Sequence, residues 1–240
     1  MGRCLRGSER ALTILGLVYI GLHLFPQVLF AHSLTVEGIT VHSRTPLPEA
    51  AAASIRKATV LLRESEVGDE LGKEDVFICG SPWMLRVFNP RGSSGFGIST
   101  PLTNHVFIAG ADFESDTARR FGADYNTRSL SGVIAHEVTH GLIRRRLGTI
   151  RGERLPTWMN EGFCEHVARD GSFPEEEGRR LFVSGEGHPS SSYRYFVYRQ
   201  LVQYLLDERQ LGFSGLVDGS HDYDALVTEV RAHLQGNAGG

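Results

Sequence analysis

The chain has 240 residues, of which 41% are hydrophobic, and a formal net charge of −3. This length is sufficient for one domain with a full hydrophobic core. The weakly acidic balance leaves no basic surface large enough for a polyanion, so we exclude nucleic acid as a partner.

The first 31 residues form a separate N-terminal segment. A mostly apolar run over residues 11–31 follows three arginines, Arg3, Arg6 and Arg10. This order is typical of a secretory signal peptide or an uncleaved membrane anchor, and about twenty apolar residues can span a bilayer. Leu29 stands where a cleavage site needs a small residue, which favours the anchor. The segment therefore predicts an exported protein, membrane-anchored or, if cleaved, secreted or periplasmic, with residues 32–240 outside the cytoplasm.

The cysteines are few. Cys79 and Cys164 are the two that lie within residues 32–240. In an oxidising compartment they could form one disulfide. No Cys-x-x-Cys pair is present, which excludes a zinc finger.

Short strands are expected in the first half of the predicted domain. Apolar residues among polar ones indicate a strand at 34–41, and helical spacing of apolar residues predicts a helix over 49–66. Residues 76–79 and 105–109 read as two further strands. The stretch 89–100 is rich in Gly, Ser and Pro and predicts a loop.

Helices are expected in the second half. An amphipathic helix is predicted near 130–146, started by Ser129 or Ser131 and ended by three arginines before Gly148. Another begins near Pro156. A loop at 184–192 precedes helices at 193–208 and 222–234. Strands followed by helices indicate an α+β fold, with a small mixed sheet.

One motif lies on the helix near residue 140. His136 and His140 are four residues apart, so both side chains can reach one metal ion. Glu137 is placed to act on a water at that ion. Glu161, on the next helix, is the best candidate for a third ligand. Three ligands leave one open position, which is typical of catalytic zinc.

The sequence His-Glu-Val-Thr-His at 136–140, followed by Trp-Met-Asn-Glu-Gly at 158–162, resembles the gluzincin metallopeptidases. This group includes the thermolysin and aminopeptidase N groups and the small peptidase MA-like domains. The resemblance covers residues 130–170 in detail and 100–210 loosely. It implies a zincin-like catalytic domain over residues 32–240 that hydrolyses peptide bonds with one Zn²⁺ per chain.

The resemblance also implies roles for individual residues. His136, His140 and Glu161 would hold the zinc, and Glu137 would be the general base. Glu165, four residues after Glu161, either orients a ligand histidine or is a surface residue. A tyrosine would bind the oxyanion, and both Tyr193 and Tyr195 are candidates for that role.

The resemblance favours an endopeptidase over an aminopeptidase. The aminopeptidase N group carries a Gly-x-Met-Glu-Asn stretch that binds the free amine of its substrate, and this chain has none before His136. The predicted strand at 105–109 would lie along the cleft and pair with an extended substrate. The expected partner is a peptide or protein substrate, with the membrane as a second partner if the N-terminal segment is uncleaved.

Two other functions fit the same residues. A zincin scaffold can bind metal or a partner without catalysis, because a fold does not determine a function. A zinc hydrolase could also cleave an amide that is not part of a protein. The sequence does not predict the oligomeric state.

Overall fold

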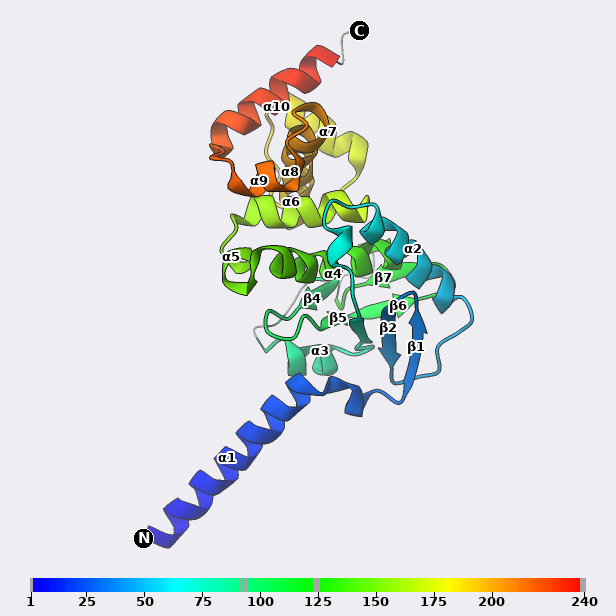
Figure 1. The fold of residues 1–240 in the computed structure, drawn as a ribbon, viewed down its shortest axis with the longest axis vertical. Helices are drawn as coiled ribbons and strands as arrows, with labels where there is room; N and C mark the ends of the chain where they lie inside the picture. The colour runs from blue at the N-terminus through cyan, green and yellow to red at the C-terminus, as the bar shows by residue number, and fades with distance from the viewer. Residues whose placement is uncertain (1, 91, 93–94, 123–125, 238–240) are drawn as a thin grey trace.

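The structure is a computed structural model that describes residues 2–90, 92, 95–122 and 126–237. It has a five-stranded sheet, a three-stranded sheet and a stack of helices (Figure 1). The α+β prediction is confirmed. The strands are β1 (His32–Val36), β2 (Ile39–Ser43), β3 (Glu74–Ile78), β4 (Gly97–Ser99), β5 (Val106–Ile108), β6 (Gly110–Asp112), β7 (Thr117–Arg119) and β8 (Thr127–Ser129). The helices are α1 (Gly2–Leu24), α2 (Ala51–Arg63), α3 (Pro82–Phe88), α4 (Leu130–Leu147), α5 (Thr149–Glu153), α6 (Thr157–Ala168), α7 (Glu175–Ser184), α8 (Ser191–Gln203), α9 (Gly212–Asp218) and α10 (Tyr223–Asn237), with single turns at Pro26–Leu29, Gly68–Glu70 and Tyr204–Glu208.

The larger sheet has the strand order β1-β2-β3-β5-β4. β2, β3 and β5 are parallel, whereas β1 and β4 are antiparallel edge strands. The single strand predicted at 34–41 is in fact a hairpin, because Glu37 and Gly38 both have positive φ, of 51° and 97°. Two such residues form the tight turn that suits the twist of a hairpin.

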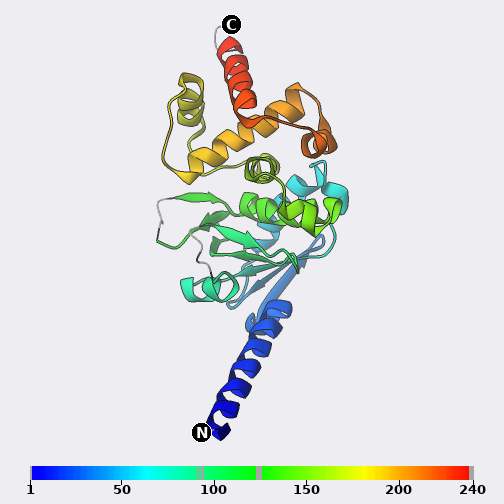
Figure 2. The same ribbon diagram turned by 90° about the vertical axis from the view of Figure 1, so that its left-hand side faces the viewer.

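The two faces of this sheet are covered by different helices. Val76 and Ile78 of β3 point to the face that α2 and α4 cover, in the main hydrophobic core. Phe77 points to the opposite face and packs with Met84 and Phe88 of α3 in a smaller core. Successive side chains of β3 therefore point into two different cores on opposite faces of the sheet. Figure 2 shows α3 on the side of the sheet away from α4.

The remaining helices build outward from α4. α6 packs on α4, and α8 packs on α6 (Figures 1 and 2). Gly162 lies at the crossing of α6 and α8, where a Cβ would lie 2.5 Å from the carbonyl oxygen of Tyr198. A glycine after Glu161 thus lets the two helices approach closely.

The strand predictions near the cleft are partly wrong. Residues 106–108 do form β5, but β5 lies inside the sheet between β3 and β4, and its residues are buried. The edge strand on this side of the sheet is β4, which lies within the stretch 89–100 that was predicted as a loop. Residues 91, 93 and 94 of that stretch lie outside the described residues. Sequence patterning failed here because a three-residue strand is too short to show alternation.

The prediction of a membrane anchor is wrong. None of the described helices is both long and apolar enough to cross a membrane. The apolar part of α1 runs only from Ala11 to Leu24, and the chain then enters a separate turn at Pro26–Leu29. A run of that length is short of the roughly 20 residues that a span needs. The membrane-anchored localisation that was expected from this segment is wrong for the same reason.

The disulfide that the sequence left open between Cys79 and Cys164 is not formed. Cys79 and Cys164 are both free and buried. Cys79 belongs to the small core around α3, and Cys164 belongs to the main core on the other side of the sheet. The sheet itself keeps the two thiols apart.

Candidate functional site

The candidate site is built on α4, whose start is fixed by two serines. The Ser129 hydroxyl caps α4 by accepting a hydrogen bond from the backbone N–H of Gly132 at 3.1 Å. The Ser131 hydroxyl and N–H both donate to the carboxylate of Asp116, at 2.8 and 3.1 Å. These contacts fix the first turn of α4, which precedes the motif at residues 136–140 on the same helix.

His136 and His140 lie one turn apart on α4, and Glu161 approaches them from α6. Glu161 Oε2 lies 3.3 Å from His136 Nε2 and 3.8 Å from His140 Nε2. Ligand distances of about 2.0–2.2 Å in a zinc tetrahedron place neighbouring ligand atoms about 3.3–3.6 Å apart. The distance to His136 lies within this range and the distance to His140 slightly beyond it, so the three donor atoms suit a zinc ion in chemistry and come close to its spacing.

Each histidine is oriented through its other ring nitrogen. His140 Nδ1 donates to Asn160 Oδ1 at 3.0 Å. The orientation of this amide is supported by its own NH₂ group, which donates to the carbonyl oxygen of Gly152. His136 Nδ1 lies 3.2 Å from Glu165 Oε1, an ion-pair contact that is not in line for a hydrogen bond. Both contacts turn Nε2 toward Glu161, which is how ligand histidines are held in metal sites.

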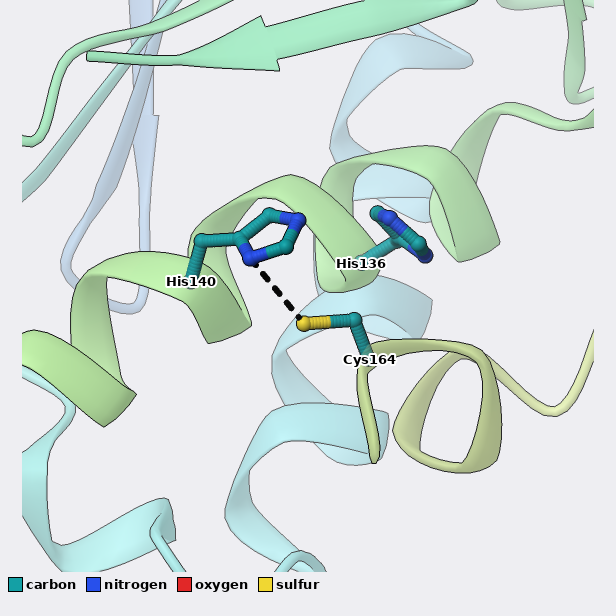
Figure 3. A group of neighbouring side chains, drawn as sticks. All are labelled: His136, His140 and Cys164. Carbon is teal, nitrogen blue, oxygen red and sulfur yellow. Dashed lines mark hydrogen bonds between the residues drawn. The ribbon is translucent and has the colours of Figure 1, made fainter. Parts of the chain in front are cut away.

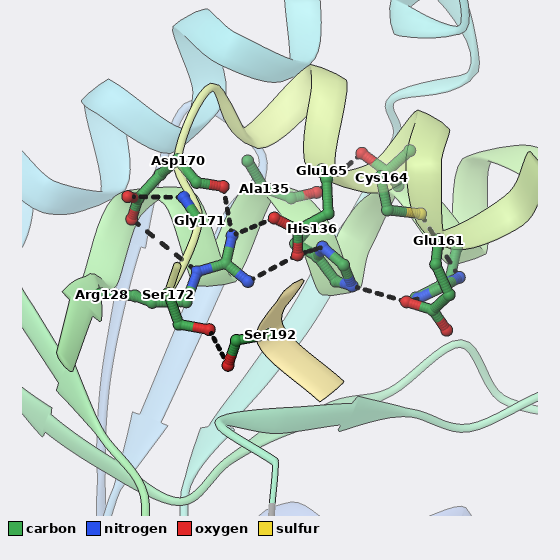
Figure 4. Close-up of polar contacts among 12 residues, drawn as sticks. Arg128, Ala135, His136, Glu161, Cys164, Glu165, Asp170, Gly171, Ser172 and Ser192 are labelled. Carbon is green, nitrogen blue, oxygen red and sulfur yellow. Dashed lines mark hydrogen bonds and ion pairs between the residues drawn. The ribbon is translucent and has the colours of Figure 1, made fainter. Parts of the chain in front are cut away.

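Glu165 is not a surface residue. It is 2% exposed and receives a two-pronged contact from the guanidinium of Arg128, with N–O distances of 2.7 and 3.2 Å (Figure 4). Arg128 also donates to the backbone carbonyl of Asp170 at 2.7 Å. Arg128, Glu165 and His136 thus form a continuous chain of contacts. No local pattern reveals Arg128, because it lies 37 residues from Glu165.

The electrostatics of the site favour a cation. Three buried or half-buried carboxylates, of Glu137, Glu161 and Glu165, lie beside the two imidazoles. The buried guanidiniums of Arg128 and Arg144, which line the same cleft, are each paired with a carboxylate, of Glu165 and Glu153. Burial would lower the pKa of His136, but Glu161 and Glu165 outweigh it and raise this pKa to about 10. Burial would raise the pKa of Glu161, but His140 and His136 bring it down to about 2. The site holds anionic oxygens beside its imidazoles, as a divalent cation requires.

Glu137 lies under the edge strand. It is 8% exposed, and a Cβ added at Gly97 of β4 would lie 2.9 Å from its Cγ. Burial raises the pKa of Glu137, and the imidazoles of His136 and His140 oppose that rise without cancelling it. Its carboxylate is therefore a stronger base than an exposed one.

A cavity of about 510 Å³ opens over these residues. It is lined by the motif residues of α4, by Glu161 and by the edge strand β4. Arg144 on α4 ties the strand to the helix by donating to Ser99 Oγ and to Asn104 Oδ1. The cavity is thus a cleft between a helix and the free edge of a sheet.

The two tyrosines occupy different places. Tyr195 is half-buried and lines the cleft, and burial together with the nearby carboxylates raises its pKa. Tyr193 is 7% exposed, packs on Phe173 and donates its hydroxyl to the carbonyl oxygen of Glu186. Tyr195 is therefore placed to act in the cleft, and Tyr193 is a packing residue.

Cys164 is an alternative neighbour of the histidine pair (Figure 3). Its sulfur lies 3.4 Å from His140 Nδ1, the nitrogen that also contacts Asn160. Burial raises the pKa of this thiol well above its ordinary value, with further contributions from nearby carboxylates. A protonated thiol on the far side of the ring is a weaker ligand than Glu161, which contacts both Nε2 atoms.

Comparison with known proteins adds no relatives. No family model matches the chain, and a search of curated proteins finds no significant match. The evidence for a function therefore comes from the residues of the cleft.

Proposed function

We propose that this protein is a zinc-dependent peptidase of the gluzincin type, with one Zn²⁺ held by His136, His140 and Glu161. The observation that carries the proposal is the convergence of both Nε2 atoms on one carboxylate oxygen of Glu161. The zincin-like character of the fold belongs to the same proposal, and the helix pair α4–α6 supports it. Three protein ligands would leave one position open for water or substrate.

Glu137 supplies the general base in this proposal. When bound, Zn²⁺ lowers the pKa of a water ligand to about 7 and polarises a substrate carbonyl. Glu137 takes the proton from the attacking water and passes it to the leaving amine. Its burial supports this role, since a raised pKa brings the carboxylate nearer to the pH at which it must exchange protons.

Tyr195 and β4 act on the substrate. The hydroxyl of Tyr195 is protonated at neutral pH, as in any tyrosine, and burial raises its pKa further, so it can donate a hydrogen bond to the oxyanion. β4 is the edge strand, and an extended peptide can pair with its free side. Pairing along a strand holds the substrate backbone on both sides of the scissile bond, which favours endopeptidase action.

The test is hydrolysis of a broad fluorogenic peptide library by the wild type and by Glu137→Gln. We expect zinc content to be unchanged and the rate to fall by about 10²–10⁴, because only the proton transfer is removed. Glu177→Gln, on the exposed side of α7, is the matched control and should keep full activity.

Other outcomes would redirect the assignment. Full activity in Glu137→Gln would contradict its role as the base. Zinc bound without cleavage of any peptide would point to a non-protein amide as substrate, or to a metal-binding domain without catalysis.

A further inference from the structure

A second cavity lies at the carboxyl ends of the parallel strands. Its volume is about 660 Å³, and it is lined by residues that directly end or follow β2 and β3, among them Ser43, Arg44, Gly80 and Ser81. It is separate from the histidines, although Arg120 lines both cavities.

The topology explains why a crevice opens there. After β2 the chain leads to α2, on the face of the sheet that α4 covers. After β3 it leads to α3, on the opposite face. Neighbouring parallel strands whose connections leave in opposite directions open a crevice at their carboxyl ends, and ligands of open α/β sheets bind in such crevices. The cavity and the topology thus point to one place independently.

The charge of this cavity is positive. Arg44 and Arg119 line it against one acid, Asp112. Arg119 pairs with Asp112 only at 3.7 Å, and 57% of its side chain is exposed. Arg44 forms no ion pair with any residue in the described part of the chain. The excess of guanidinium groups favours an anion.

Two further residues, Ser81 and Trp83, line the same crevice. Ser81 Oγ is buried and has no hydrogen-bond partner among the described residues. Trp83 is 57% exposed, and the guanidinium carbon of Arg44 lies 5.5 Å from its ring centroid. Because the Ser81 hydroxyl has no partner where it lies, its side chain can turn toward a ligand oxygen in the crevice without losing a hydrogen bond.

We propose that this crevice binds an oxyanion, a phosphate or carboxylate group, held by Arg44 and Arg119 with Ser81 as an additional donor. The proposal does not depend on the peptidase activity, since it uses no residue of the zinc site. The oxyanion could belong to a free phosphate-bearing ligand or to an acidic side chain of a peptide.

The test is calorimetric titration of the full chain with inorganic phosphate, against chloride at equal ionic strength. We expect saturable binding in the wild type and in Arg63→Ala, an exposed arginine of α2 that is paired with Glu37. Each of Arg44→Ala and Arg119→Ala should weaken it about tenfold, the loss expected for one charge-assisted contact. Arg120 is left unchanged because it also lines the cleft. Trp83 fluorescence in Arg119→Ala reports whether a residual ligand still sits in the crevice.

A second titration, with N-acetyl-aspartate amide, separates the two sources. Binding of phosphate alone assigns the site to a free phosphate-bearing ligand, and binding of both assigns it to acidic peptide groups as well. A response to phosphate no larger than the response to chloride would overturn the proposal. Unchanged affinity in Arg44→Ala/Arg119→Ala would overturn it too.

Discussion

The two histidines of the candidate zinc site are held by partners of different charge. His136 faces the carboxylate of Glu165, whereas His140 donates to the neutral amide of Asn160. A carboxylate partner makes an imidazole the more basic ligand. Arg128 in turn neutralises Glu165, so that a buried charge does not remain unpaired.

Arg128 is therefore a positioning residue, and Arg128→Met tests it. We expect metal affinity to fall by about 10–100-fold, since Glu165 loses the contact that holds it against His136. The free energy of unfolding should fall by about 3–5 kcal/mol, because the Glu165 carboxylate stays buried without its partner. Zinc affinity is measured by competition with a chelator, and stability by urea denaturation.

The double variant Arg128→Met/Glu165→Leu is the control for this experiment. It removes both charges and should recover most of the stability while leaving zinc affinity low. Wild-type zinc affinity in either variant would show that Arg128 and Glu165 serve packing alone.

At the residue scale, the sequence predicts a site from local spacing but misses distant partners. His136, Glu137 and His140 are found from one helical turn, and Glu165 is considered because it follows Glu161 by four residues. Arg128 is missed, since its contact with α6 depends on how β8 and α6 pack together. Sequence alone could not choose between Tyr193 and Tyr195, because two residues along a helix point to nearly opposite faces and the packing of α8 decides which face meets the cleft.

At the scale of elements, the edge strand β4 decides what the cleft can bind. Its first residue, Gly97, leaves the space that the side chain of Glu137 occupies. The same glycine is one reason that the stretch 89–100 reads as a loop. Gly97 thus lets β4 lie close to Glu137, and it also makes this strand difficult to predict from the sequence.

Gly97→Ala tests the contact between β4 and α4. The new Cβ would lie 2.9 Å from Glu137 Cγ and 3.1 Å from its Oε1, so the carboxylate must move. A displacement near 1 Å can cost about 10²-fold in rate, and we expect kcat to fall with zinc content unchanged. Gly187→Ala is the control, because nothing lies within 4 Å of its Cβ. Equal kcat in both variants would contradict the placement of Glu137.

The start of α4 gives a prediction for pH. Burial would raise the pKa of Asp116, but hydrogen bonds from Ser131, Ser54 and Lys57 hold it below its ordinary value of 3.8. A carboxyl group whose pKa is lowered by folding stabilises the protein above its unfolded pKa, and this stabilisation is lost as the pH falls through the folded pKa.

Asp116→Asn should therefore lower the free energy of unfolding by about 1 kcal/mol at pH 7, through lost charge-assisted hydrogen bonds at a helix start. Asparagine suits the backbone at this position, where φ is 50°. Urea denaturation at pH 7 and near pH 3 measures the difference, which should shrink at the lower pH. A difference that grows toward acid would contradict this account.

At the scale of the whole molecule, the order of the predicted elements gives the fold class correctly, but the N-terminal segment is wrongly predicted as a membrane anchor. The order of strands before helices gives α+β, and the buried apolar pattern of α4 and α6 gives the central layers. The charge-then-apolar order of residues 1–31 suggests a membrane segment, but it does not show that the helix ends at Leu24, before a separate turn at Pro26–Leu29. In Figure 1, α1 extends away from the lower end of the molecule. Tyr19 of α1 donates a hydrogen bond to the carbonyl oxygen of Val87.

The most direct test of the central claim is the metal content of the purified full chain, measured by elemental analysis. The account predicts one zinc per chain in the wild type and in Glu137→Gln, and a clear loss in Glu161→Ala, because among the described residues Glu161 is the one carboxylate that contacts both Nε2 atoms. A wild-type chain that binds no zinc when zinc is supplied, or a Glu161→Ala variant that keeps it at full affinity, would contradict the proposed metal centre.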